Sequence, residues 1–295
     1  MRTREEKMKD ITSLIETEES KLYKKKLAIK IFKTICILSF IVAIAVLYTH
    51  LYATTGLLVK ENKITNSKIP ESFRGSKLIQ FSDLHYGSTF FDSELKSVVK
   101  KINKRKPDIV VFTGDLINKN YKLSDKDKEK LIKTLNNIDA SLGKYAIFGE
   151  EDNDLANDIL LQSNFKILNN NHDLIYNNST ESINIVGIAS KDNINEAFTD
   201  VNTELFTICL LHEPDKIDNV LKDHYVDLAL AGHSHNGQIK VFIPLMKKRN
   251  GTKYFKEYYK INDTKLYVSS GLGTSNVNFR FGAHPSINFF RLYNN

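Results

Sequence analysis

The sequence predicts an α/β layered fold, with one membrane-spanning helix in front of it. From residue 77 onward, short apolar runs of strand length recur, and amphipathic stretches with a helical period lie between several of them. This alternation is typical of buried sheets that are covered by helices. A long run without charged residues near the N-terminus predicts the membrane helix.

Composition allows a sizeable core and disfavours one class of partner. The chain has 295 residues, is 41% hydrophobic and carries a net charge of +7. Its basic residues are scattered apart from one N-terminal cluster, whereas a nucleic-acid binder more often shows a continuous basic stripe. The two cysteines, Cys36 and Cys209, lie in apolar runs and are expected to be small buried hydrophobic residues. We therefore expect neither nucleic-acid binding nor a thiolate metal site.

The N-terminal region predicts a single-pass anchor. Residues 34–59 contain no formally charged side chain and exceed the roughly 20 apolar residues that a bilayer requires. A buried helix of a soluble domain should show a polar face, and this run shows none. Lysines at positions 24–26, 30 and 33 precede it, so residues 1–33 are expected to be a charged, helical, cytoplasmic segment. The cell membrane is thus the predicted location, with everything after the uncleaved anchor outside the cytoplasm.

The rest of the chain is divided into a polar linker at residues 60–76 and a domain at residues 77–295. The apolar runs predict strands at Leu78–Phe81, Ile109–Phe112, Tyr145–Phe148, Ile183–Val186, Phe206–Leu211, Val226–Ala231 and Leu266–Val268. Helices are expected to begin near Ser93 and Ser124, which can act as N-caps. Runs at Gln238–Phe242 and Asn288–Leu292, which lack helices between them, predict a second, more antiparallel sheet.

Candidate functional residues follow the ends of five predicted strands. Ligands of α/β sheets bind beyond the carboxyl ends of the strands, so these side chains are expected to share one site. In the D-x-H and H-x-H pairs, alternate residues of an extended segment would point the same way. The residues are Asp83, His85, Asp115, Glu150, Glu151, Asp152, His212, His233 and His235.

The residue types favour a metal site. Mixed carboxylate and imidazole ligands suit Mn, Fe or Zn, and the absence of thiolates argues against a structural zinc. Glycines precede Asp115, Glu150 and His233, and they allow sharp turns and a close approach of the backbone. One such motif alone is weak evidence, but five in this order predict a metal centre.

The order D-x-H, G-D, G-(N-H-D), H, G-H-x-H resembles the calcineurin-like metallophosphoesterases. Residues 267–273 and 280–282 are similar to the membrane-associated bacterial branch that includes the YkuE group. The resemblance implies a four-layer α/β-β/α sandwich of two mixed sheets, with two divalent metal ions between them. It implies that Asp83, His85 and His235 hold one metal, that Asp115 bridges, and that Glu150, His212 and His233 hold the second.

The implied activity is hydrolysis of phosphoester or pyrophosphate bonds by metal-activated water at the membrane surface. Its substrate would be a phosphorylated small molecule or a lipid-linked compound. The family's G-N-H-D reads Gly149-Glu150-Glu151-Asp152 here, so Glu151 stands where the family carries a histidine that assists the leaving group. Glu151 and Asp152 are the candidate catalytic residues. Two alternatives stay open: a metal-binding pseudoenzyme that acts as a sensor or scaffold, and a nuclease of the same fold.

Overall fold

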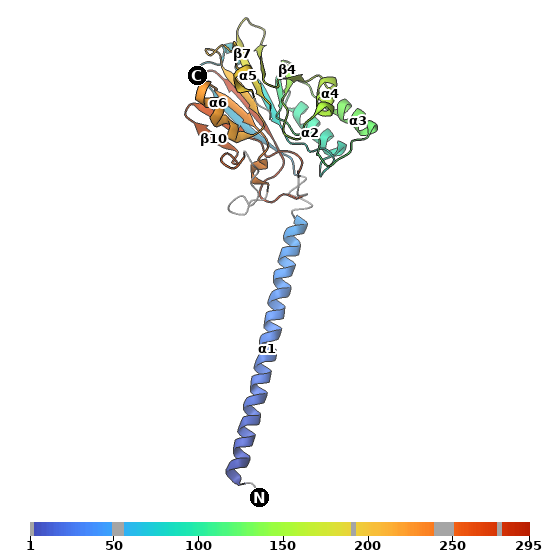
Figure 1. Ribbon diagram of the computed structural model, residues 1–295, viewed down its shortest axis with the longest axis vertical. Coiled ribbons are helices and arrows are strands. Elements are labelled where there is room, and N and C mark those ends of the chain that lie inside the picture. The colour runs from blue at the N-terminus through green and yellow to red at the C-terminus, as the bar shows by residue number, and fades with distance from the viewer. Residues whose placement is uncertain (1–2, 49–55, 190–192, 239–250, 276–278) are drawn as a thin grey trace. The chain divides into compact units, whose positions relative to one another are not determined.

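The computed structural model describes residues 3–48, 56–189, 193–238, 251–275 and 279–295, which belong to two compact units, Met1–Tyr48 and Thr49–Asn295 (Figure 1). In the first unit, the charged segment and the start of the apolar run form one continuous helix, α1 (Arg4–Tyr48). Helix α1 is long and apolar enough to cross a membrane, by length and composition. Its described side chains are exposed, including Cys36, which we had expected to be buried; Cys209 is buried as expected.

The second unit has the predicted four layers. Its described residues form two six-stranded sheets that pack face to face, with helices on the outer side of each. The first sheet has the order β1 (Leu58–Thr65), β12 (Ser286–Tyr293), β2 (Lys77–Phe81), β3 (Ile109–Phe112), β4 (Gly143–Ala146) and β5 (Lys166–Ile167). The second has the order β10 (Tyr258–Ile261), β11 (Thr264–Val268), β9 (Leu228–Ala231), β8 (Thr207–Leu211), β7 (Ser182–Ile188) and β6 (Asn171–Tyr176).

Three buried clusters of described residues fill the spaces between these layers. One lies between the sheets, where β3 packs against β8 and β9. A second joins the first sheet to α2 (Asp92–Lys104), α3 (Asp125–Asn136) and α4 (Asp154–Gln162). The third joins the second sheet to α5 (Ile194–Ala197) and α6 (Ile217–Asp223). Burial of both faces explains why the central strands read as continuous apolar runs.

The two predicted helices form, but one begins earlier than expected. The Ser124 side chain caps α3 by accepting a hydrogen bond from the Asp127 N–H at 3.2 Å. Helix α2 begins after Phe91, not at Ser93, because the Glu94 carboxylate accepts the Phe91 N–H at 3.0 Å. The Ser93 hydroxyl instead bonds to the Glu94 carboxylate at 2.9 Å. The apolar face of α2, formed by Leu95, Val98, Val99 and Ile102, is buried.

The segment predicted as a linker begins with a strand. Residues 58–65 form β1, which pairs in parallel with β12 over its whole length, and Ile64 is buried. Leu58 and Val59, which we had placed at the end of the anchor, therefore belong to the sheet. Strand β1 lies at the edge of the sheet, where most of its side chains are exposed or only partly buried, so its sequence reads as polar. Edge strands of this kind give a weak apolar signal.

The C-terminal strands also differ from the prediction. Strand β12 joins the first sheet between β1 and β2, and it is antiparallel to β2. The second sheet is mixed: among its described strands β10 pairs antiparallel with β11 and β6 with β7, whereas β11, β9, β8 and β7 run parallel to their neighbours in that series. The strand predicted at Gln238–Phe242 lies, after Gln238, outside the described residues.

The packing of strand β1 in the first sheet is expected to contribute measurably to the stability of the folded domain. Ile64→Ala should lower the free energy of unfolding by about 2–5 kcal/mol, the usual effect of truncating a buried isoleucine. Urea denaturation of the full chain in detergent, followed by circular dichroism, measures this change. Ser67→Ala, at an exposed position just beyond the strand, is the matched control and should change stability by less than about 0.5 kcal/mol. Equal stabilities of the two variants would contradict the role of β1 in the fold.

Candidate metal centre

The two sheets deliver the predicted side chains to one place. Asp83 and His85 follow β2, Asp115 follows β3, and residues 150–152 follow β4, which are neighbouring strands of the first sheet. His212 follows β8, and His233 and His235 follow β9, which are neighbours in the second sheet. Because these parallel strands end at the same edges, their following loops meet between the sheets.

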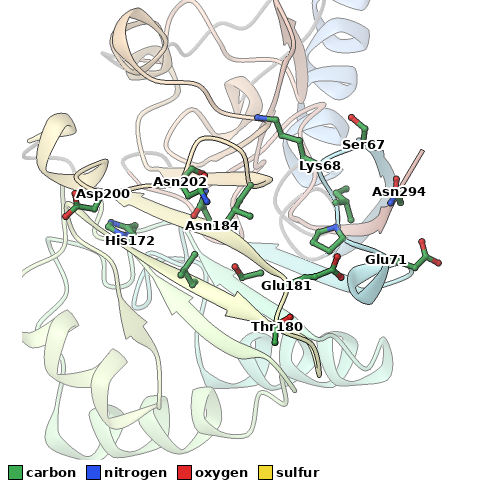
Figure 2. A pocket seen from close by; sticks show the side chains of 15 residues that line it. Ser67, Lys68, Glu71, His172, Thr180, Glu181, Asn184, Asp200, Asn202 and Asn294 are labelled. Carbon is green, nitrogen blue, oxygen red and sulfur yellow. The ribbon is translucent and has the colours of Figure 1, made fainter.

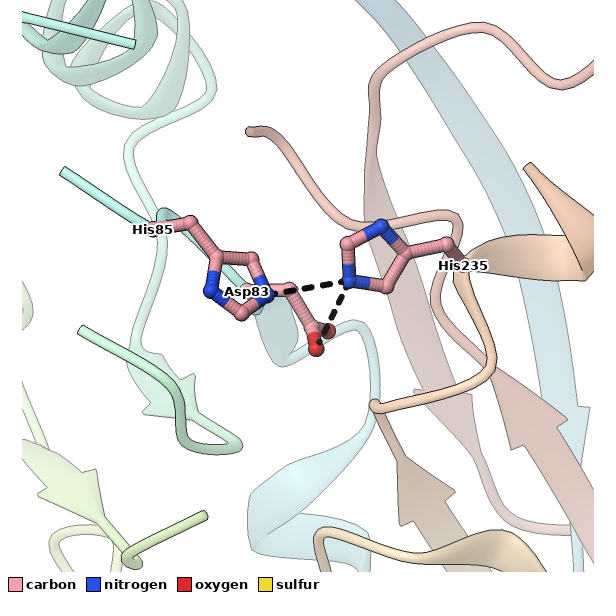
Figure 3. A group of neighbouring side chains, drawn as sticks. All are labelled: Asp83, His85 and His235. Carbon is pink, nitrogen blue, oxygen red and sulfur yellow. Dashed lines mark hydrogen bonds and ion pairs between the residues drawn. The ribbon is translucent and has the colours of Figure 1, made fainter. Parts of the chain in front are cut away.

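A first set of ligand atoms belongs to Asp83, His85 and His235, whose side chains are fully buried (Figure 3). The Nε2 atoms of His85 and His235 face each other at 3.2 Å. His235 Nε2 also lies 3.3 Å from Asp83 Oδ1. All three residues therefore direct ligand atoms at one point.

A second set belongs to Asp115, His212 and His233, which are buried as well. His212 Nε2 lies 3.2 Å from Asp115 Oδ2, and its Nδ1 lies 2.7 Å from the Thr113 carbonyl oxygen. Asp115 Oδ2 is also 3.5 Å from His85 Nε2, so this carboxylate lies between the two sets. The Glu150 side chain is about half exposed (52%), and its Oε1 lies 4.0 Å from His233 Nδ1, at the rim of the second set.

The charges in this cluster fit a cation. Asp115 Oδ2 and His212 Nε2 are buried, and they lie 3.2 Å from each other. Burial alone would raise the pKa of Asp115, but His212 outweighs it and holds that pKa well below its usual range. Burial alone would lower the pKa of His212, but Asp115 raises it to about 10. Buried charges require a partner of opposite charge, and these nitrogen and oxygen atoms suit a divalent metal.

The ligand loops are not extended, as we had expected for the D-x-H and H-x-H pairs. Asp83, His85, Asp115, His233 and His235 have φ values between 41° and 64°, in the left-handed region. The argument from alternation therefore fails for His233 and His235, which contribute to different sets, whereas Asp83 and His85 do contribute to the same set. Non-glycine residues in this region cost of order 1–3 kcal/mol each and cluster at functional sites.

Comparison with known proteins agrees with this geometry. Residues 76–237 match the family model described as calcineurin-like phosphoesterase. The chain belongs to this family. Of its relatives, the uncharacterized metallophosphoesterase YkuE of Bacillus subtilis is 32% identical over 257 residues, which cover 82% of this chain and 86% of YkuE.

Two further relatives carry more specific names. The UDP-2,3-diacylglucosamine pyrophosphatase LpxG of Chlamydia trachomatis is 29% identical, over 77% of this chain and 87% of LpxG. A Danio rerio transmembrane protein with a metallophosphoesterase domain is 26% identical, over 83% of this chain and 61% of that protein. The chain also spans only 63% of the length of metallophosphoesterases from Campylobacter jejuni and Helicobacter pylori.

Two of the predicted glycines allow close packing in this calcineurin-like centre. A methyl group on Gly149 would collide with the Asp115 carboxylate. A methyl group on Gly232 would collide with the Ser82 hydroxyl and the Asp83 carboxylate. Both positions therefore need glycine so that the loops of the two sheets can approach the ligands.

Asp152 of the modified G-N-H-D motif holds the ligand loops together. Its carboxylate accepts the backbone N–H groups of Asp115, Leu116 and Gly149 at 2.7, 2.8 and 2.8 Å. Burial, followed by the nearby Asp115 carboxylate, raises the pKa of Asp152 to about 6. With both oxygens bonded to the backbone, this side chain fixes the loop that carries Asp115.

Arg280 is a residue whose part in the site the sequence did not reveal. It is fully buried, and its Nη1 donates to the Ser270 carbonyl at 2.6 Å and the Ala283 carbonyl at 3.3 Å. Its Nη2 donates to the Gly273 carbonyl and lies 3.4 Å from His235 Nδ1. Burial lowers the pKa of Arg280 to about 10, partly offset by Asp83. In the sequence, only the family resemblance at residues 280–282 drew attention to Arg280, and it did not indicate what this side chain does.

A separate pocket of about 670 Å³ is shown in Figure 2. It lies at the ends of the strands that are opposite to the ends carrying the candidate metal ligands. It is lined by residues such as Lys68, His172 and Asn184, and none of the candidate metal ligands contributes to it. His172 lines this pocket and is partly buried. The chemistry of the ligands, and not the size of a cavity, therefore locates the candidate metal centre.

The hydrogen bonds of Asp152 predict a defined loss of stability. In Asp152→Asn, an amide nitrogen replaces one accepting oxygen and leaves at least one buried N–H unpaired, which costs about 1–3 kcal/mol. Chemical denaturation of the metal-free chain measures this loss. Asp139→Asn, on an exposed aspartate, is the control and should change stability by less than about 0.5 kcal/mol. Unchanged stability of Asp152→Asn would contradict the positioning part given to this carboxylate.

Proposed function

We propose that this chain is a metal-dependent hydrolase of phosphoester or pyrophosphate bonds that works through a dinuclear metal centre. The observation that supports this most directly is the pair of adjoining buried ligand sets, with the Asp115 carboxylate between them. Asp83, His85 and His235 would hold one ion, and His212, His233 and the nearby Glu150 would hold the other. Asp115 would bridge the two ions.

The chemistry divides between the metals and the chain. When bound, two divalent ions supply Lewis acidity toward a phosphoryl group and lower the pKa of water enough to make a nucleophile. Asp115 would hold both ions, and its own position is fixed by hydrogen bonds to Asp152 and from the Glu151 N–H. Glu150 and the neighbouring Lys119 are about half exposed, whereas the other proposed metal ligands are buried, so the phosphoryl group would enter on the side of these two residues.

The substrate class is proposed from the anchor and from one relative. LpxG is named as a pyrophosphatase of UDP-2,3-diacylglucosamine, which carries acyl chains and a pyrophosphate. Helix α1 has the composition of a membrane-spanning segment, and one relative is named as a transmembrane protein. We therefore propose a phosphorylated small molecule or a lipid-linked substrate, hydrolysed at the outer surface of the cell membrane.

A pseudoenzyme is the second candidate, and one observation favours it. Glu151 replaces the histidine of the G-N-H-D pattern, and its carboxylate is held against His85, 3.1 Å from Nδ1. A chain that binds two metals but hydrolyses no aryl phosphate monoester, aryl diester or pyrophosphate would be a metal-dependent sensor or scaffold. A panel of these substrates, tested with the metal-loaded protein, distinguishes the two functions.

The proposed bridge predicts different effects for two ligands. Asp115→Asn should lower the metal content and reduce hydrolysis by more than about 100-fold, because residues that merely support ligands already contribute about 10–100-fold. His233→Ala should chiefly weaken one of the two sites. Metal analysis by mass spectrometry and turnover of aryl phosphates measure both effects.

The control for these ligands is His172→Ala, which removes an imidazole from the separate pocket and should leave metal content unchanged. Two retained metals and normal turnover in Asp115→Asn would show that the proposed bridge is wrong.

The lysine cluster before the apolar run predicts the orientation of the chain. A protease added to intact cells or protoplasts should degrade the domain that begins near residue 60, while an N-terminal epitope tag stays protected. Lysed cells, in which both parts are accessible, provide the control. Protection of the domain until lysis would reverse the proposed orientation.

A further inference from the structure

We propose that Glu151 is a positioning residue, which orients His85 and selectively strengthens the metal site formed by Asp83, His85 and His235. Its place in the G-N-H-D pattern had suggested a catalytic residue. This inference rests on the metal centre proposed above, and it concerns the one position where the chain replaces the family's histidine with a carboxylate.

The first argument is the fixed position of Glu151. Its Oε2 lies 3.1 Å from His85 Nδ1 and also accepts the Lys119 backbone N–H at 3.2 Å. Its own N–H donates to Asp115 Oδ1 at 3.0 Å. The side chain is only 7% exposed, whereas that of the adjacent Glu150 is 52% exposed. Glu151 is therefore turned into the wall of the site, toward a ligand and away from solvent.

The second argument is the hydrogen-bonding capacity of the two groups. An ionised carboxylate can only accept hydrogen bonds, so Nδ1 of His85 must carry the hydrogen. The lone pair of the ring then lies on Nε2, the atom that faces His235 Nε2 at 3.2 Å and Asp115 Oδ2 at 3.5 Å. The contact with Glu151 thus selects the tautomer that can bind a metal within this cluster.

The third argument is a comparison within the same centre. His212 is also held from behind, but its Nδ1 bonds to the neutral carbonyl of Thr113 at 2.7 Å. Of these two histidines, His85 has a charged carboxylate behind its Nδ1, whereas His212 has a neutral carbonyl. A carboxylate behind a ligating histidine fixes the ring and raises its basicity, and losing such a partner typically costs about 10–100-fold in metal affinity. The effect of Glu151 should therefore fall on one site of the two.

The test is zinc binding to the full-length, metal-free protein in detergent, measured by isothermal titration calorimetry. Glu151→Gln keeps the shape of the side chain and removes its charge. We expect the dissociation constant of one zinc site to rise by about 10–100-fold, while that of the other stays at its wild-type value. Glu129→Gln makes the same chemical change at an exposed position outside the metal centre and serves as the matched control, which should leave both zinc sites unchanged.

Two backgrounds identify the affected site. In His235→Ala, which disrupts the Asp83, His85 and His235 set, adding Glu151→Gln should have little further effect. In His233→Ala, which keeps that set, adding Glu151→Gln should weaken zinc binding by the full factor. The opposite pattern would overturn the inference.

A measurement on the wild-type chain needs no variant to fold. Nitrogen-15 NMR of the zinc-loaded protein, labelled at histidine, should show His85 protonated on Nδ1 and metal-bound through Nε2. Binding through Nδ1 would overturn the inference. Two zinc ions bound equally well by wild type and Glu151→Gln would also overturn it and leave the proposed function intact. Absence of zinc binding by the wild type would instead refute the metal centre and this inference together.

Discussion

The central constraint on this structure is a buried carboxylate, Asp115, that lies between two groups of imidazoles. Its Oδ2 is 3.2 Å from His212 and 3.5 Å from His85, and both histidines are fully or almost fully buried. A carboxylate in this position is stable only with positive charge beside it, supplied by protons or by metal ions. The backbone around it is arranged to keep that carboxylate in place, through the N–H of Glu151 and the three bonds to Asp152.

This constraint explains why two sheets are needed. The candidate ligands on one side follow β2 and β3, and those on the other follow β8 and β9, so each of the two sets described above draws on both sheets. The left-handed backbone of Asp83, Asp115 and His233 is unfavourable in isolation. It persists because buried packing between the sheets and hydrogen bonds such as the His233 N–H to Asp83 hold it. The packing of the two sheets thus maintains an unfavourable backbone conformation that directs these side chains toward the candidate metal centre.

The sequence predicted the central strands and the set of candidate residues, and it failed at the edges. Strands such as β3 are buried on both faces, so their apolar runs are continuous and easily recognised. Strand β1 is an edge strand that reads as polar, and its partner β12 is distant in sequence, so their pairing leaves no local pattern. The left-handed ligand loops were missed because tertiary packing imposes them. The sequence pointed to these loops only through the adjacent glycines, Gly114 and Gly232. These glycines predicted sharp turns and a close approach of the backbone, but not the left-handed conformation of the residues beside them.

The two glutamates after Gly149 show how the structure separates residues that the sequence treats alike. Both are acidic, adjacent and next to the same strand, and a motif can only place them near the metals. In the structure, Glu150 faces solvent at the rim of the second set, while Glu151 is buried behind His85. Because the buried carboxylate already bonds to an imidazole and a backbone N–H, it has no need of a substrate to satisfy it. Glutamate in place of histidine at position 151 thus puts a negative charge behind the proposed ligand His85. From there we expect it to change the metal affinity of that site and not to contact the substrate.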